Sequence, residues 1–96
     1  MVKSYEQGKS YEHEAYPCVI ETAKNFQLAG EDIIRMETPT IPMEDPDKQV
    51  ITYRESIGVM AVITPWNFPT TIPSEYIGPG LAAGNTMVMK LSLIHI

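Results

Sequence analysis

The sequence predicts an α/β fold made of a long helix, an extended arm and one β-strand–α-helix–β-strand unit. The first observation is an apolar run from Gly58 to Ile63 that does not alternate with polar residues, as in a parallel strand covered on both faces. The second is a helix-like segment from Thr71 to Ala83, followed by a short strand from Thr86 to Lys90. A crossover of this length allows the two strands to run parallel.

Residues 1–37 are predicted to be helical. Over residues 11–36, apolar and small side chains recur along one stripe, which predicts a buried face made of Val19, Ala23, Phe26, Gly30 and Ile33. Pro17 is compatible only with the first turn of a helix, so we expect the regular helix to begin near Tyr16. The Gly-Lys-Ser sequence at residues 8–10 is expected to separate it from an earlier helix.

Residues 38–56 are predicted to form an extended connector and a strand. Three prolines, at Pro39, Pro42 and Pro46, lie among few candidates for a core and favour an extended backbone. The stretch from Val50 to Glu55 alternates apolar and polar side chains, which is typical of a strand with one solvent-exposed face.

Residues 57–90 hold the predicted β-strand–α-helix–β-strand unit. Gly84 follows the helix candidate and is expected to end it in the left-handed conformation. Pro79 lies inside the same candidate and is expected to kink it.

Size and charge exclude several classes of protein. The 96 residues make one small domain at most, or part of a larger one. A net charge of −5, without a basic stripe, argues against a nucleic-acid partner. The N-terminus lacks the apolar core of a signal peptide, and no apolar run approaches the ~20 residues that span a bilayer. A single cysteine, Cys18, cannot form an internal disulfide, so we expect a cytoplasmic protein.

The segment Ile63-Thr64-Pro65-Trp66-Asn67-Phe68-Pro69 carries most of the functional information. Its two prolines restrict the backbone of a loop that follows a predicted buried strand. The carboxyl ends of strands are where open α/β sheets bind their ligands. On such a support, Asn67 has either of two roles: a neutral donor to an oxyanion, or a cap for the next helix.

Two stretches of the chain resemble a known family. Residues 56–69 (Ser-Ile-Gly-Val-Met-Ala-Val-Ile-Thr-Pro-Trp-Asn-Phe-Pro) and residues 80–90 (Gly-Leu-Ala-Ala-Gly-Asn-Thr-Met-Val-Met-Lys) are similar to the start of the cofactor domain in NAD(P)-dependent aldehyde dehydrogenases. The resemblance covers roughly residues 5–90, and its Pro-Trp-Asn-Phe-Pro string is highly specific. It implies a fragment of a Rossmann-type cofactor-binding domain.

The resemblance implies roles for individual residues. Asn67 would donate its side-chain N–H to the oxygen of the thiohemiacetal formed when a cysteine attacks an aldehyde. Lys90 would donate to hydroxyls of the adenosine ribose, although a strand-end lysine taken alone is usually only solvated. The dinucleotide would run along the backbone of Ile63, Thr64, Pro65 and Trp66. The ordinary alternative for Trp66 is a core residue.

Other motifs do not point to a site. The spacing G-x-G-x-x-x-G ends a helix rather than opening one, which excludes a dinucleotide fingerprint at Gly78, Gly80 and Gly84. Cys18 has no activating neighbours in the sequence and is interpreted as a packing residue. His13 and His95 lack metal-ligand spacing, so no metal site is predicted.

The family resemblance implies an oxidoreductase that converts a small-molecule aldehyde to an acid with NAD or NADP, and that forms a homo-oligomer as the full enzyme. The family's cysteine nucleophile and glutamate base match no residue up to Lys90, so we expect this chain alone to be inactive. We also expect it to be poorly stable, because its two core strands lack the neighbouring strands of the family's sheet and leave apolar edges exposed. The alternatives are a standalone nucleotide-binding module and an interaction module. Residues 91–96 do not follow the family pattern, and we interpret them as a non-native tail.

Overall fold

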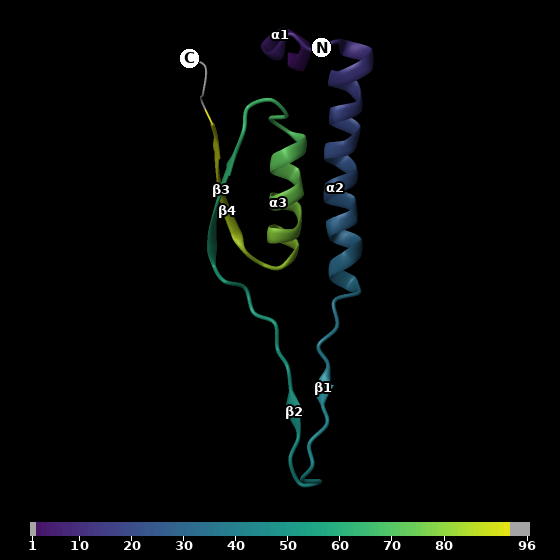
Figure 1. The fold of residues 1–96 in the computed structure, drawn as a ribbon, viewed down its shortest axis with the longest axis vertical. Helices are drawn as coiled ribbons and strands as arrows, with labels where there is room; N and C mark the ends of the chain where they lie inside the picture. Colours follow the sequence, from purple (N-terminus) through teal and green to yellow (C-terminus); the bar gives the residue numbers. More distant parts are fainter. Residues whose placement is uncertain (1, 93–96) are drawn as a thin grey trace.

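The computed structural model describes residues 2–92 as an elongated molecule measuring 65 × 26 × 17 Å. Its wider part has three layers: helix α2 (Tyr16–Ile34) packs on helix α3 (Thr71–Ala82), and α3 packs on a two-stranded sheet (Figure 1). A narrow arm extends away from these layers (Figure 1). None of the helices in residues 2–92 is long and apolar enough to cross a membrane.

The N-terminal region contains two helical segments before α2. Helix α1 (Val2–Gln7) is followed by Gly8, whose φ of 66° lies in the left-handed region, and this confirms the expected break. A short π-helix, η1 (Tyr11–Ala15), then leads directly into α2. The α-helix begins at Tyr16 with Pro17 in its first turn, as predicted.

The buried face of α2 differs from the predicted one. Four members of the predicted stripe are exposed: Val19, Ala23, Phe26 and Gly30. Instead, the buried residues of η1 and α2 are Ala15, Cys18 and Ala29. The reason is the small surface of α3 at the contact, where a Cβ on Gly78 would lie 3.3 Å from the Cβ of Ala29. Such close packing selects small side chains on α2 over the larger apolar ones.

Polar contacts also hold the two helices together. The Nδ2 of Asn25 donates to the Oγ of Ser74 at 2.9 Å, and that hydroxyl donates to the Thr71 carbonyl at 2.6 Å. The Thr71 hydroxyl in turn donates to the carbonyl of Cys18 at 3.2 Å. Cys18 is buried in this interface, which agrees with the packing role expected of it.

The arm is a hairpin of two short antiparallel strands, β1 (Thr40–Ile41) and β2 (Val50–Ile51). The prediction of a strand from Val50 to Glu55 is wrong beyond Ile51. Thr52 donates both its N–H and its hydroxyl to the carbonyl of Pro39, but Pro39 has no N–H to return. The pairing therefore ends there, and residues 52–58 form no strand.

The β-strand–α-helix–β-strand unit is confirmed. Strands β3 (Val59–Thr64) and β4 (Thr86–Leu91) are parallel, with Val59 opposite Thr86 and Ile63 opposite Lys90. Helix α3 connects them and is followed by Gly84 at φ 82°, the expected left-handed position. Pro79 lies inside α3, and the kink expected there stays a prediction. The predicted non-native tail, residues 91–96, is described only at its first two residues. Leu91 ends β4, and the N–H of Ser92 donates to the Thr64 carbonyl at 2.8 Å. Residues 93–96 lie outside the described part.

Strand β3 is covered on one face only, whereas the sequence predicts cover on both. Val62 and Thr64 are buried on the side of α3, but Val59 and Ile63 are 72% and 71% exposed. The cause is the layer order: α2 packs on the outer side of α3 and leaves the other sheet face open within residues 2–92 (Figure 1).

Asn85 fixes the start of β3 against the end of α3. Its side chain is 8% exposed, and its Oδ1 accepts the N–H groups of Ile57 at 2.6 Å and Gly58 at 3.1 Å. Its Nδ2 donates to the carbonyl of Gly80 at 3.2 Å. Sequence reasoning assigned no role to this residue.

Candidate functional site

The candidate site lies at the carboxyl ends of the two parallel strands. Residues 65–70, which we call the Asn67 loop, connect β3 to α3 at this edge (Figure 1). The carbonyl of Phe68 accepts the N–H of Ile72 at 3.2 Å, and the carbonyl of Thr70 accepts that of Ser74 at 3.1 Å. The end of the loop is therefore continuous with the first turn of α3.

The Asn67 side chain is exposed and makes no hydrogen bond to any residue in the range 2–92. The N-cap residue of α3 is Thr70, and within residues 2–92 no side-chain hydrogen bond caps this helix. The capping alternative for Asn67 is therefore not present in the structure. The amide donors are left available to a bound molecule, which an oxyanion donor requires.

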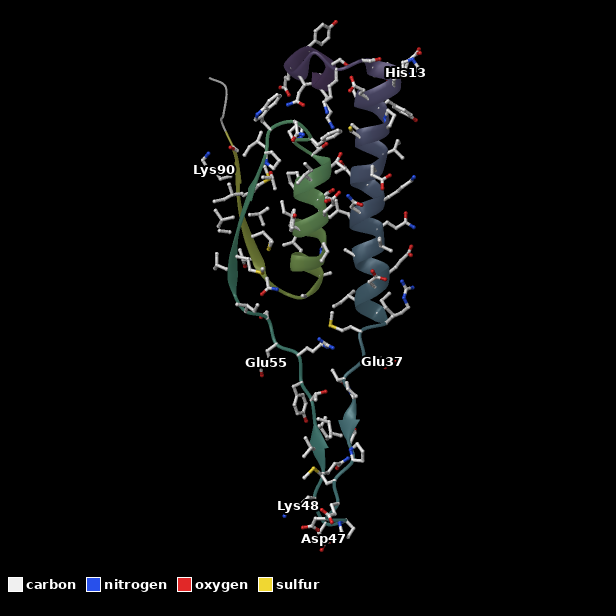
Figure 2. All side chains as sticks on the ribbon, in the orientation of Figure 1. His13, Glu37, Asp47, Lys48, Glu55 and Lys90 are labelled. Atoms are coloured by element: carbon white, nitrogen blue, oxygen red, sulfur yellow. The ribbon has the colours of Figure 1, made fainter. Side chains whose placement is uncertain are left out.

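The structure brings Ile63 and Lys90 together. They are register partners on adjacent strands, and they lie on the open face of the sheet. The exposed Lys90 side chain projects away from the helical layers near the carboxyl end of β4 (Figure 2), and its Nζ donates to the Leu91 carbonyl at 3.1 Å. An ammonium in this position is accessible to hydroxyl groups of a bound molecule.

Thr64 differs from its neighbours because its side chain is 2% exposed and lies on the α3 side of the sheet. Its Oγ1 has no hydrogen-bond partner among residues 2–92. Pro65 and Trp66 are exposed in the loop. Trp66 is thus not a buried core residue. Because the Thr64 side chain is buried, Thr64 can contact a ligand at the open edge only through its backbone.

The N-terminal region contacts the Asn67 loop, which sequence reasoning missed. Lys3 Nζ donates to Thr70 Oγ1 at 2.9 Å, and Gln7 Nε2 donates to the Trp66 carbonyl at 2.8 Å. The Nζ of Lys9 lies 3.5 Å from the centroid of the Phe68 ring. Nothing in the local pattern of either segment signals these pairs, because 59 residues separate Gln7 from Trp66.

A mostly apolar groove of about 600 Å³ runs along β3 and α3. Of the predicted site residues, Ile63 alone lines it, next to Val62, Tyr76 and Met87. The groove is therefore distinct from the loop edge that holds Asn67.

The candidate site contains no metal-ligand cluster among the residues that the structure describes. Within residues 2–92, no group of three or more His, Cys, Asp or Glu side chains is placed to hold a metal ion. Away from the site, the hydrogen bond from Lys48 lowers the pKa of Asp45 in the hairpin turn. Lys48 lies at the tip of the arm (Figure 2).

Comparison with known proteins decides the family, because residues 1–94 match the model of the aldehyde dehydrogenase family. The chain belongs to the aldehyde dehydrogenase family. It is 45% identical over 85 residues to glutarate-semialdehyde dehydrogenase of Pseudomonas aeruginosa, a match that covers 88% of this chain and 17% of that protein. It is 36% identical over 93 residues to 2,5-dioxopentanoate dehydrogenase of Saccharolobus solfataricus, covering 94% of this chain and 19% of that protein.

A solved structure confirms the fold. The crystal structure of succinate-semialdehyde dehydrogenase from Burkholderia pseudomallei matches this aldehyde dehydrogenase chain with a TM-score of 0.77 and 37% sequence identity. The match covers 82% of this chain and 16% of that one. The chain therefore spans less than a fifth of the length of the relatives that it matches.

Proposed function

We propose that this chain is a segment of an enzyme that oxidises an aldehyde to a carboxylic acid with NAD or NADP, and that it supplies one catalytic group, Asn67. The observation that carries the proposal is the exposed Asn67 amide, free of hydrogen bonds to residues 2–92, on a loop anchored at the carboxyl ends of parallel strands. In the reaction, a cysteine thiolate bonds to the carbonyl carbon, and the electron pair of the opening C=O π bond places negative charge on the oxygen of the thiohemiacetal. The Asn67 N–H stabilises that charge. Loss of hydride from the former carbonyl carbon leaves a thioester, which water hydrolyses to the acid and the free cysteine.

The residues of the open edge fit a dinucleotide. Lys90 donates to ribose hydroxyls, while Ile63 beside it offers an apolar contact for the adenosine half. The backbone of Thr64, Pro65 and Trp66 continues this surface toward Asn67. The nicotinamide of NAD or NADP, when bound, supplies the hydride acceptor.

Asn67→Ala in a family-length enzyme that carries these residues tests the proposed role. Loss of one pre-aimed donor to an oxyanion lowers kcat by about 10²–10³-fold. The binding of the cofactor, measured by fluorescence titration with NADH or NADPH, is expected to stay close to wild type. A kcat within threefold of wild type would refute the role of Asn67 while leaving the family assignment intact.

The nucleophile and the general base of the proposed reaction come from elsewhere in the enzyme. Cys18 is the only cysteine of this chain, and it is buried between α2 and α3. The chain alone is expected to show no aldehyde-dependent reduction of NAD or NADP. Turnover above a buffer blank, in protein purified from a host lacking contaminating dehydrogenase, would contradict this.

The substrate we propose is an aldehyde that carries an acid group. The names of several relatives specify such substrates: glutarate semialdehyde, succinate semialdehyde and 3-sulfolactaldehyde. The family-length enzyme is expected to have a higher kcat/KM for succinate semialdehyde than for butanal, which has the same number of carbons and no charge. An equal or higher value for butanal would overturn this substrate class.

We also propose that the arm joins subunits of a homo-oligomer. Its strands are short and expose Ile41, Val50 and Ile51, so the hairpin buries little apolar surface by itself. Ile51→Lys in the family-length enzyme is expected to reduce the mass measured by light scattering. An unchanged mass would argue against a role of the arm in assembly.

A further inference from the structure

We propose that Gln7 and Lys9 are positioning residues that hold Asn67 in place through its two neighbours in the sequence. Gln7 Nε2 donates to the carbonyl of Trp66, the residue before Asn67. Lys9 Nζ lies 3.5 Å above the ring of Phe68, the residue after it. The inference rests on the proposed oxyanion role of Asn67.

The local structure of the N-terminal region brings the side chains of Gln7 and Lys9 into contact with the Asn67 loop. Gln7 ends α1, and Gly8 reverses the chain with φ 66° while its N–H donates to the Ser4 carbonyl at 2.9 Å. This turn allows consecutive contacts from Gln7 and Lys9 to reach the same loop. Both side chains are half-buried, so neither contact is fully screened by water.

The contacts of Gln7 and Lys9 lie in the middle of the Asn67 loop, away from its anchored ends. At its ends, the loop is held by the sheet and by the first turn of α3, through the Thr64 and Phe68 carbonyls. Asn67 lies between these anchors, and an oxyanion donor loses its effect when it is displaced by about 1 Å. A hydrogen bond on one side of Asn67 and a cation–π contact on the other limit movement of its backbone.

The cation–π contact predicts a measurable change in loop order. Removing a contact of this type shifts the equilibrium between the docked and released loop by about two- to fivefold. Lys9→Met removes the charge but keeps most of the apolar stem, whereas Lys9→Arg keeps a cation above the ring. Lys24→Met is the matched control, because Lys24 is an exposed lysine on α2 with a surface ion pair to Glu21.

The first experiment is a double-mutant cycle in the family-length enzyme. Lys9→Met is expected to lower kcat about two- to fivefold, Lys9→Arg to restore it, and Lys24→Met to leave it unchanged. In an Asn67→Ala background, Lys9→Met is expected to have no further effect on kcat, because its effect passes through Asn67. An equal loss of kcat in both backgrounds would overturn the inference, as would a loss that Lys9→Arg fails to restore.

The second experiment does not depend on activity. Trp66 is the only tryptophan of the chain, so its fluorescence reports on the loop directly. Acrylamide quenching of Trp66 is expected to increase with Lys9→Met and with Gln7→Glu, which loses the Nε2 donor, and not with Lys24→Met. Unchanged quenching in both variants would overturn the positioning contact. Increased quenching together with a normal kcat for Asn67→Ala would instead uphold the contact and refute the proposed function.

Discussion

Replacing Asn85 with alanine removes the side chain that ties the start of β3 to the end of α3. Three hydrogen bonds are lost: those from the N–H groups of Ile57 and Gly58 to Oδ1, and that from Nδ2 to the Gly80 carbonyl. Each contributes about 0.5–1.5 kcal/mol net, so we expect unfolding free energy to fall by about 2–4 kcal/mol. This is a large part of the stability of a domain of this size.

Urea unfolding followed by far-UV circular dichroism measures the effect. At a slope of about 1–3 kcal/mol/M, the midpoint is expected to fall by roughly 0.7–4 M, or the folded baseline to disappear. Asn67→Ala is the matched control, because it makes the same change at an exposed asparagine without hydrogen bonds to residues 2–92. If Asn85→Ala and Asn67→Ala unfold at the same urea concentration, Asn85 does not hold β3 and the reasoning is refuted.

Three further predictions concern packing and charge. Gly80→Ala places a Cβ 2.7 Å from the Sδ and Cε of Met87, the end of a flexible side chain that can turn away, while alanine favours the helix by about 1 kcal/mol over glycine. We therefore expect the free energy of unfolding to change by less than about 1 kcal/mol in urea unfolding, and to rise by about 1 kcal/mol in a Met87→Ala background. A loss of stability that is equal in both backgrounds would contradict a contact with Met87. Ser74→Ala removes the hydroxyl that accepts a hydrogen bond from Asn25 on α2, and the free energy of unfolding measured in urea is expected to fall by about 1–3 kcal/mol. An unchanged free energy of unfolding would mean that water replaces the hydroxyl. The pKa of Asp45, followed by NMR, is expected to lie below 3.8 and to rise in Lys48→Met. Because the folded-state pKa is lowered, this pair stabilises the fold at neutral pH, and that stabilisation is lost as the pH falls through the folded-state pKa. An unchanged pKa in Lys48→Met would exclude the pair.

Patterns within short stretches of sequence predicted the secondary structure of the β-strand–α-helix–β-strand unit well. An apolar run, a helix ended by Gly84 and a second strand are local signals, and the structure places the two strands in parallel register. The strand after Val50 was predicted too long, because alternation alone does not reveal that its partner position is Pro39, which has no N–H.

Features that depend on which helices and strands pack against each other were not predicted from the sequence. The stripe containing Val19 and Phe26 has the right period for a buried face, yet α3 presents Ser74 and Gly78 and so packs on the smaller side of α2. At the candidate site, the pattern indicated Asn67 and Lys90 as residues of interest. The structure adds that no side-chain hydrogen bond from the described residues caps α3. Their proposed roles remain predictions for the experiments above.

The contacts between the N-terminus and the Asn67 loop also bear on the order of folding during synthesis. Lys3 and Gln7 are made first, but their partners Thr70 and Trp66 follow 67 and 59 residues later. At about 5–20 residues per second, a ribosome needs roughly 3–12 s to add the intervening chain. Helix α1 therefore has no contact with the Asn67 loop while α2, the arm and β3 are being synthesised. The loop reaches its final geometry only after it has been synthesised and α1 has packed against it.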